Sequence, residues 1–124
     1  MLLYVFDGAR MHVGSETTLS ACHLSAKQAV TVGHRSGVGP GSRVFDSDQH
    51  DRDAEHLEQT APVHIEDFVW VTADVSILRG VTIGSHSVIG TRSVVARSIP
   101  PHTLAAGSPA VPVGKVGDRS GIRL

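Results

Sequence analysis

The sequence predicts an all-β parallel solenoid, and two regularities of the chain support this fold class. Branched aliphatic residues recur every six positions across residues 65–95, at Ile65, Val71, Ile77, Ile83, Ile89 and Val95. A helix repeats at about 3.6 residues and a strand at about 2, so neither produces this spacing. Positions four residues after each aliphatic are also apolar or small, and aromatic residues make up 4% of the chain, as a narrow core requires.

Each six-residue unit is expected to form a short strand followed by a corner. Three units, roughly 18 residues, would close one triangular coil, and stacked coils would share a single thin apolar core. Glycine follows the aliphatic residue directly in two units, at Gly84 and Gly90. Since glycine adopts positive φ angles readily, these residues predict a corner with such an angle.

The amino-terminal part of the chain carries the same pattern with one interruption. Residues 2–6 are an apolar run that predicts a strand, and Val13 and Leu19 begin the six-residue spacing. The spacing then resumes at three valines, Val32, Val38 and Val44. Leu19 and Val32 lie thirteen residues apart instead of twelve, so one extra residue is predicted to bulge from the coil within residues 20–31.

Residues 46–62 interrupt the repeat and predict a loop that leaves the solenoid. The segment is polar and charged, so it cannot lie in the apolar core. Within it, residues 53–59 have the composition for one or two helical turns. Long loops in compact domains are often functional, which makes this segment a candidate for part of a site. The repeat returns at Val63 and continues to Ile99.

After Ile99 the sequence Pro100-Pro101 is expected to stop strand pairing, because proline has no amide hydrogen. Residues 111–124 predict either a loose tail or a final strand laid along a coil. We expect residues 1–124 to form a single domain.

Bulk properties narrow the possible partners. The net charge of the 124 residues is −1, which provides no general attraction for nucleic acid or acidic membranes. No apolar stretch approaches the length of a membrane span, and the first residues do not form a signal-peptide pattern. The single cysteine, Cys22, cannot form an internal disulfide, so we expect a reducing, cytoplasmic setting.

Several segments resemble the hexapeptide-repeat acyltransferases, which are left-handed parallel β-helix enzymes. The resemblance is carried by Val81-Thr82-Ile83-Gly84, by Val69-Trp70-Val71 and by residues 99–110, which read IPPHTLAAGSPA. With residues 44–50, these segments resemble the sugar O-acetyltransferase branch. The resemblance implies a left-handed β-helix with one extruded loop, assembled as a homotrimer with active sites between neighbouring subunits. It also implies transfer of an acetyl group from acetyl-CoA to a hydroxyl of a sugar or glycan precursor.

His50 is the candidate general base. Its segment, Asp46-Ser47-Asp48-Gln49-His50, resembles the one that holds the catalytic histidine in sugar acetyltransferases. A sugar hydroxyl attacks a thioester efficiently only as its proton is removed, and an imidazole with an ordinary pKa of about 6.5 suits that task. Asp46 or Asp48 would orient the ring. The alternatives are a solvated loop histidine and turn-capping carboxylates.

The coenzyme would be held mainly by backbone groups beside small residues. The resemblance places Trp70 near the active site and implies coenzyme contacts for four further residues, Ala73, Thr91, Ala96 and Arg97. Ala106 and Gly107 are small enough to let a pantetheine arm approach, and Lys115 could meet the phosphates. Simple corner packing for the small residues, a place on a subunit-contact face for Trp70 and solvated surface charge for Lys115 remain alternatives.

Two other functions stay open. Val30-Thr31-Val32-Gly33-His34 resembles part of the γ-class carbonic anhydrases, but Gly39 stands where that family places another histidine. We therefore expect no metal site. The second alternative is a catalytically silent solenoid that serves in assembly or binding. It is supported by the lack of any asparagine and by Val111-Pro112, which stands where relatives often carry a basic residue.

Overall fold

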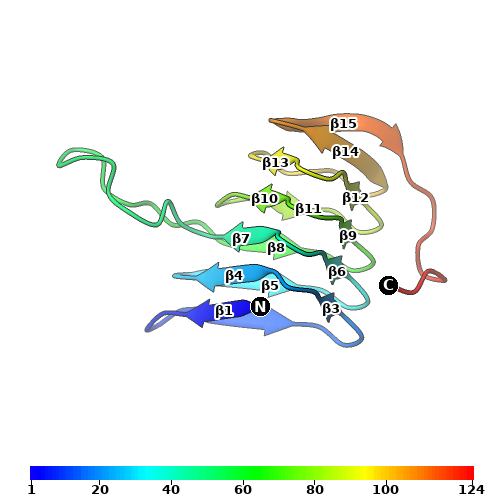
Figure 1. Ribbon diagram of the computed structural model, residues 1–124, viewed down its shortest axis with the longest axis horizontal. Helices are drawn as coiled ribbons and strands as arrows, with labels where there is room; N and C mark the ends of the chain where they lie inside the picture. The colour runs from blue at the N-terminus through cyan, green and yellow to red at the C-terminus, as the bar shows by residue number, and fades with distance from the viewer.

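The computed structural model describes all 124 residues, and its regular structure consists of strands alone. The predicted left-handed parallel β-helix with one extruded loop is confirmed (Figure 1). No helix has the length and apolarity needed to span a membrane. The strands are β1 (Leu2–Val5), β2 (Arg10–Val13), β3 (Thr18–Leu19), β4 (His23–Ala26), β5 (Ala29–Val32), β6 (Gly37–Val38), β7 (Arg43–Phe45), β8 (Val63–Ile65), β9 (Trp70–Val71), β10 (Ser76–Ile77), β11 (Thr82–Ile83), β12 (Val88–Ile89), β13 (Val94–Val95), β14 (Thr103–Gly107) and β15 (Ala110–Lys115).

The strands stack into three walls, and each of the first four coils contributes one strand to each wall. The first wall has the order β1-β4-β7-β10-β13, the second β2-β5-β8-β11, and the third β3-β6-β9-β12-β14-β15. Every pair is parallel except β14 with β15. In Figure 1 the coils rise from β1 at the bottom to β14 and β15 at the top.

The predicted aliphatic residues form the core. All six of the regular repeat are at most 1% exposed, and they stack directly, for example Ile65 on Ile83 and Ile77 on Val95. The second core position lies four residues after the inward aliphatic. Buried serines at this position form hydrogen bonds between their hydroxyls and backbone groups. The Ser36 hydroxyl donates to the carbonyl of Glu66 at 2.7 Å and accepts from the N–H of Val69 at 3.1 Å. Such pairing lets a polar side chain occupy the core at little cost.

The predicted positive φ angles at Gly84 and Gly90 are wrong, because neither glycine adopts one. Left-handed residues instead lie three positions after the inward aliphatic. Six non-glycine examples are Arg35, Phe68, Asp74, His86, Arg92 and His102. The N–H of each donates to a carbonyl in the coil below it, such as that of Phe68 to His34 O at 3.0 Å. This hydrogen bond offsets the steric cost of the left-handed conformation.

Gly84 is needed for a different reason, which is close approach between coils. A Cβ atom at this position would lie 2.3 Å from the backbone nitrogen of Pro101. At Gly90 the corresponding contact, to the Cβ of Ala106, would be 3.1 Å. Glycine at these positions therefore lets successive corners stack.

The irregularity predicted within residues 20–31 is present, but it combines two changes. Leu24 is the inward residue of the first wall, five positions after Leu19, and Val32 follows eight positions later. The additional residues form a turn at Lys27-Gln28 between β4 and β5. The first spacing is one residue shorter than the regular six, and the second is two residues longer. The net result is the one extra residue that the sequence predicts.

Beyond β13 the structure departs from the predicted register. Ile99 bridges to Ile83 and so takes the inward position of the second wall, only four residues after Val95. Strand pairing stops at the two prolines, as predicted, and it resumes at Thr103, where β14 joins β12. For residues 111–124 the sequence predicts either a loose tail or a final strand. The strand is confirmed as far as Lys115, where β15 ends. The remaining residues run back along the third wall (Figure 1).

Residues 46–62 project far from the coils, as predicted (Figure 1). Their two limbs are joined by an isolated antiparallel bridge between Ser47 and Thr60. Residues 53–59 contain bends and no helical turn, so that part of the prediction is wrong. Asp53 accepts from the N–H groups of Glu55 and His56 at 2.9 and 2.8 Å, which closes the loop tip as a turn.

Gly84→Ala is expected to lower the free energy of unfolding by about 1–3 kcal/mol, because the new methyl group forces adjacent corners apart. Chemical denaturation of the variant and the wild type measures this change. Gly117→Ala is the control, since a Cβ there meets no atom within 4 Å. Equal stability of the Gly84 variant and the wild type would show that the corners are not packed as described.

Candidate functional site

Asp46 lies where the loop leaves β7, and it is fully buried. Its carboxylate accepts hydrogen bonds from the backbone N–H groups of Lys27, Gln28 and Ala29 at 2.8, 2.7 and 2.7 Å. These are the groups of the irregular turn in the coil beneath the loop. Asp46 therefore does not orient His50. The Asp46 carboxylate closes this turn instead.

His50 is exposed and lines a polar hollow of about 550 Å³ on the loop. Asp48, Arg52, His56 and Arg79 line the same hollow. The loop positions four of these residues, and Arg79 reaches the hollow from the corner after β10. An imidazole in such an open, polar hollow is accessible to a hydroxyl-bearing molecule.

Asp48 is paired with Arg79 rather than with His50. The Arg79 Nε donates to the Asp48 Oδ1 at 2.8 Å, and the N–H of Gln59 donates to Oδ2 at 3.3 Å. The hydrogen bond from Arg79 lowers the pKa of Asp48. Both side chains are partly exposed, at 43% and 39%. Asp48 therefore stays ionised in the hollow, and no hydrogen bond links it to His50.

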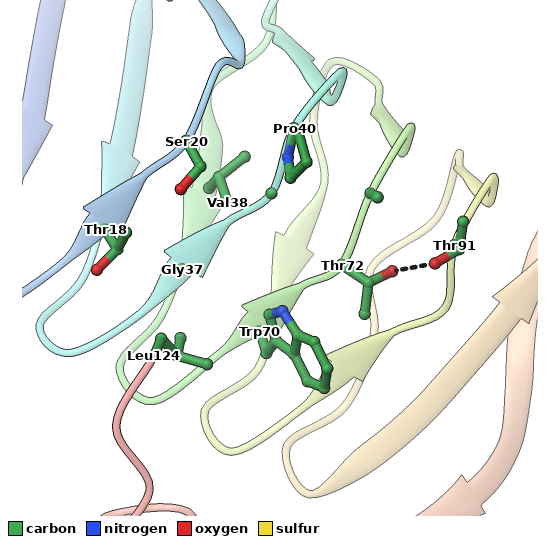
Figure 2. Close-up of a pocket in the computed structure, with 11 residues that line it drawn as sticks. Thr18, Ser20, Gly37, Val38, Pro40, Trp70, Thr72, Thr91 and Leu124 are labelled. Carbon is green, nitrogen blue, oxygen red and sulfur yellow. Dashed lines mark hydrogen bonds between the residues drawn. The ribbon is translucent and has the colours of Figure 1, made fainter.

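A second hollow, of about 460 Å³, lies along the third wall and its following corner (Figure 2). Trp70, Ala73 and Thr91, three of the predicted coenzyme contacts, line it. Figure 2 shows the Trp70 ring beside the hydrogen bond between the hydroxyls of Thr72 and Thr91, which measures 3.1 Å. The hollow combines an aromatic face with small residues and hydroxyl groups.

The other predicted coenzyme residues are divided between locations. Ala106 and Gly107 lie one coil above Gly90, at the same corner as Thr91. Ala96 lines a third hollow together with Asp48 and Arg79, and Arg97 is exposed beside it. Lys115 is exposed and lies opposite Thr103, at the far end of β14. The hollow of His50 and that of Trp70 have no lining residue in common.

The segment after β15 packs against the Trp70 hollow. The guanidinium of Arg119 lies 5.7 Å from the centre of the Trp70 ring, and its Nε donates to the carbonyl of Phe68 at 3.1 Å. The backbone N–H of Arg119 donates to the His86 Nδ1 at 2.9 Å. Leu124 then lies against Gly37 and lines one end of the hollow (Figure 2).

Sequence reasoning missed Arg79 and Lys27. The pairing of coils could have identified Arg79. Val44 pairs with Ile77, and Asp46 and Arg79 each follow two residues later, at the same corner. This places Arg79 one coil above Asp46. Lys27 lay within the segment whose register was broken, so its position could not be assigned from the repeat.

The remaining candidate chemistry is limited. Burial raises the pKa of the Cys22 thiol, which keeps it protonated and unreactive. His34 accepts at Nδ1 from the backbone N–H of Ser15 at 2.8 Å, as part of corner packing. No group of three or more His, Cys, Asp or Glu side chains is arranged to hold a metal ion.

Comparisons with known proteins agree with this geometry. No family model matches the chain. A Schizosaccharomyces pombe protein, named provisionally as an acetyltransferase, is 41% identical in a 117-residue alignment that covers 90% of this chain and 56% of the relative. The chain thus spans little more than half the length of that relative.

Solved structures show the same architecture. A hexapeptide-repeat-containing acetyltransferase from Vibrio cholerae, complexed with acetyl coenzyme A, matches 94% of this chain and 66% of its own with a TM-score of 0.83 and 29% identity. A maltose O-acetyltransferase from Clostridium difficile matches 94% of this chain and 67% of its own with a TM-score of 0.79 and 30% identity. The repeat, the coil geometry and these similarities together place the chain in the hexapeptide-repeat acetyltransferase family.

Proposed function

We propose that the chain transfers an acetyl group from acetyl-CoA to a hydroxyl of a sugar or glycan acceptor. The main support is the exposed His50 in a polar hollow of a solenoid whose structural relatives include an acetyl-CoA complex and a maltose O-acetyltransferase. His50 is the general base of this proposal. The 46–62 loop shapes the acceptor pocket around it.

The reaction needs one proton acceptor and one stabilised oxyanion. His50 takes the proton of the acceptor hydroxyl as that oxygen attacks the thioester carbonyl carbon. The carbon–sulfur bond then breaks, and the proton passes from the imidazolium to the departing sulfur. A backbone N–H near the thioester would stabilise the negative oxygen of the tetrahedral intermediate.

We assign coenzyme binding to the Trp70 hollow and the corner above it. Ala73, Ala106 and Gly107 leave the backbone accessible to a pantetheine arm, and Trp70, which is 40% exposed, offers it an apolar face. Because this hollow and that of His50 lie on separate parts of the surface, one chain does not assemble both halves. We therefore propose a homotrimer in which the Trp70 corner of one copy faces the loop of a neighbouring copy.

Asp48 and Arg79 form a fixed ion pair on the wall of the acceptor pocket. The charged carboxylate offers acceptor oxygens for sugar hydroxyls, while Arg79 holds its orientation. In the absence of contact with His50, Asp48 contributes to acceptor binding rather than to orientation of the base.

A silent solenoid remains the second candidate, and one observation favours it. Leu124 lies in the Trp70 hollow, and Arg119 covers part of the Trp70 ring. If this segment is a permanent occupant, the hollow is closed to coenzyme A and the solenoid acts as an assembly module. Binding of coenzyme A separates the two functions.

His50→Ala is expected to lower kcat by about 10²–10⁴-fold while the fold is retained, because only the proton acceptor is removed. Release of free thiol from acetyl-CoA, measured against a panel of sugars, antibiotics and amino acids, provides the rate. His12→Ala is the control, since this exposed histidine lies on β2, away from the loop. A near-normal rate in the His50 variant would exclude it as the base.

Coenzyme A at 100 times its Kd is expected to raise the free energy of unfolding by about 2.7 kcal/mol. Trp70→Ala should raise that Kd about tenfold, because an exposed tryptophan is a typical anchor for a bound group. Thermal unfolding with increasing coenzyme A tests both values. Tyr4→Ala provides a control with a similarly exposed aromatic ring. No stabilisation of the wild type at millimolar coenzyme A would instead support the silent solenoid.

Arg79→Gln is expected to raise the pKa of Asp48 towards its ordinary value of about 3.9. The hydrogen bond from Arg79 is the largest cause that holds this pKa low, so its loss makes protonation easier. An NMR titration of the Asp48 carboxyl carbon measures the shift. Arg43→Gln is the control, because Arg43 bonds to Ser76 on the first wall. An unchanged Asp48 pKa would argue against the ion pair.

A further inference from the structure

Lys27 sits in the irregular turn and reaches up to the loop above it. Its Nζ donates to the carboxylate of Glu58 at 2.7 Å and to the backbone carbonyl of Gln49 at 3.2 Å. The ammonium also lies 4.9 Å from the centre of the Phe6 ring. Gln49 belongs to the outgoing limb of the loop and Glu58 to the returning limb, so one charged group holds both limbs.

The side chain of Lys27 is not needed to close the coil. The backbone N–H groups of the turn are already satisfied by the buried carboxylate of Asp46. The Lys27 ammonium makes its hydrogen bonds to loop groups alone. Its side chain is 20% exposed and that of Glu58 is 24% exposed, so water screens this pair less than a fully exposed one.

The contact with Gln49 bears directly on His50, which is the next residue. Gln49 has a φ of 71°, a left-handed conformation that is sparsely populated for a non-glycine residue. Its N–H and side-chain amide both bond to the hydroxyl of Ser47, at 3.2 and 2.7 Å. With the bond from Lys27 to its carbonyl, Gln49 is held on both sides, and the direction in which the chain enters His50 is set.

We propose that Lys27 is a positioning residue that fixes His50 through the backbone of Gln49. This inference rests on the proposed role of His50 as general base. Asp46 holds the turn, the turn directs Lys27, and Lys27 joins the two limbs of the loop. A catalytic base acts efficiently only when it is held close to the reacting proton, so a loosened loop lowers the rate although His50 itself is intact.

The test compares Lys27→Met, which keeps most of the length of the side chain without its charge, with Lys27→Arg, which keeps the charge and donors. Glu58→Gln removes the ion pair alone, and it provides a second variant should Lys27→Met fail to fold. Arg43→Met is the matched control, because the Arg43 guanidinium bonds within the solenoid, to Gly41 and Ser76. Hydrogen exchange of the Asp48 and Gln49 amides is measured beside kcat and KM.

In Lys27→Met we expect these two amides to exchange at least ~10-fold faster, since the loop opens without global unfolding. We expect kcat to fall by about 10- to 100-fold, with KM for acetyl-CoA changed less than about twofold, because the base is displaced and the coenzyme hollow is untouched. Glu58→Gln should show smaller changes in the same direction. Lys27→Arg should restore both readouts, and Arg43→Met should match the wild type.

Unchanged exchange in Lys27→Met would overturn the inference whatever the enzyme's activity. So would faster exchange with wild-type kcat, provided that His50→Ala is inactive, and the proposed function would then still stand. Full activity in His50→Ala would remove the proposed base and the positioning role together. If kcat falls equally in Lys27→Met and Arg43→Met, the loss comes from a general disturbance of the solenoid. That result would also overturn the positioning role of Lys27.

Discussion

The core of this solenoid holds one inward aliphatic side chain from each wall in each coil, together with the buried valines and serines of the second core position. Ile65, Ile77 and Ile89 stack on the equivalent residues of the next coil with almost no exposed surface. Hydrophobic burial is therefore distributed over the stacked coils, and each coil depends on contact with its neighbours. Any segment that lacks the repeat must leave the prism at a corner. All of the candidate chemistry is consequently found on the outer surface.

The two largest irregularities of the chain meet at one such corner. The turn at Lys27-Gln28 interrupts one coil, and the 46–62 loop leaves the next coil directly above it. The carboxylate of Asp46 satisfies the backbone of the turn, and Lys27 returns two hydrogen bonds to the loop. An extra turn that would be a defect in a regular solenoid thus becomes the support for the loop that carries His50. This arrangement explains why a fully buried carboxylate is tolerated, since both of its oxygens are paired.

The distribution of the hollows bears on the proposed acetyl transfer. The His50 hollow is polar and built by the loop, whereas the Trp70 hollow is shallow and lined by the small residues of the third wall. A narrow prism cannot fold around a substrate, because its core is filled and its walls are flat. If both hollows serve one reaction, a second copy of the chain has to supply one of them, which is the reason for proposing a trimer.

The six-residue spacing alone determined the solenoid, the inward residues of the regular coils and the extruded loop. Sequence reasoning failed where the contacts depend on how coils stack. It offered Asp46 as a carboxylate that would orient His50, and it read Gly84 as a positive φ corner. Each of these depends on which residue lies one coil above or below, and a change of register by a few residues alters that neighbour. Periodicity encodes burial locally, whereas the partner of a corner side chain is set only once the coils are stacked.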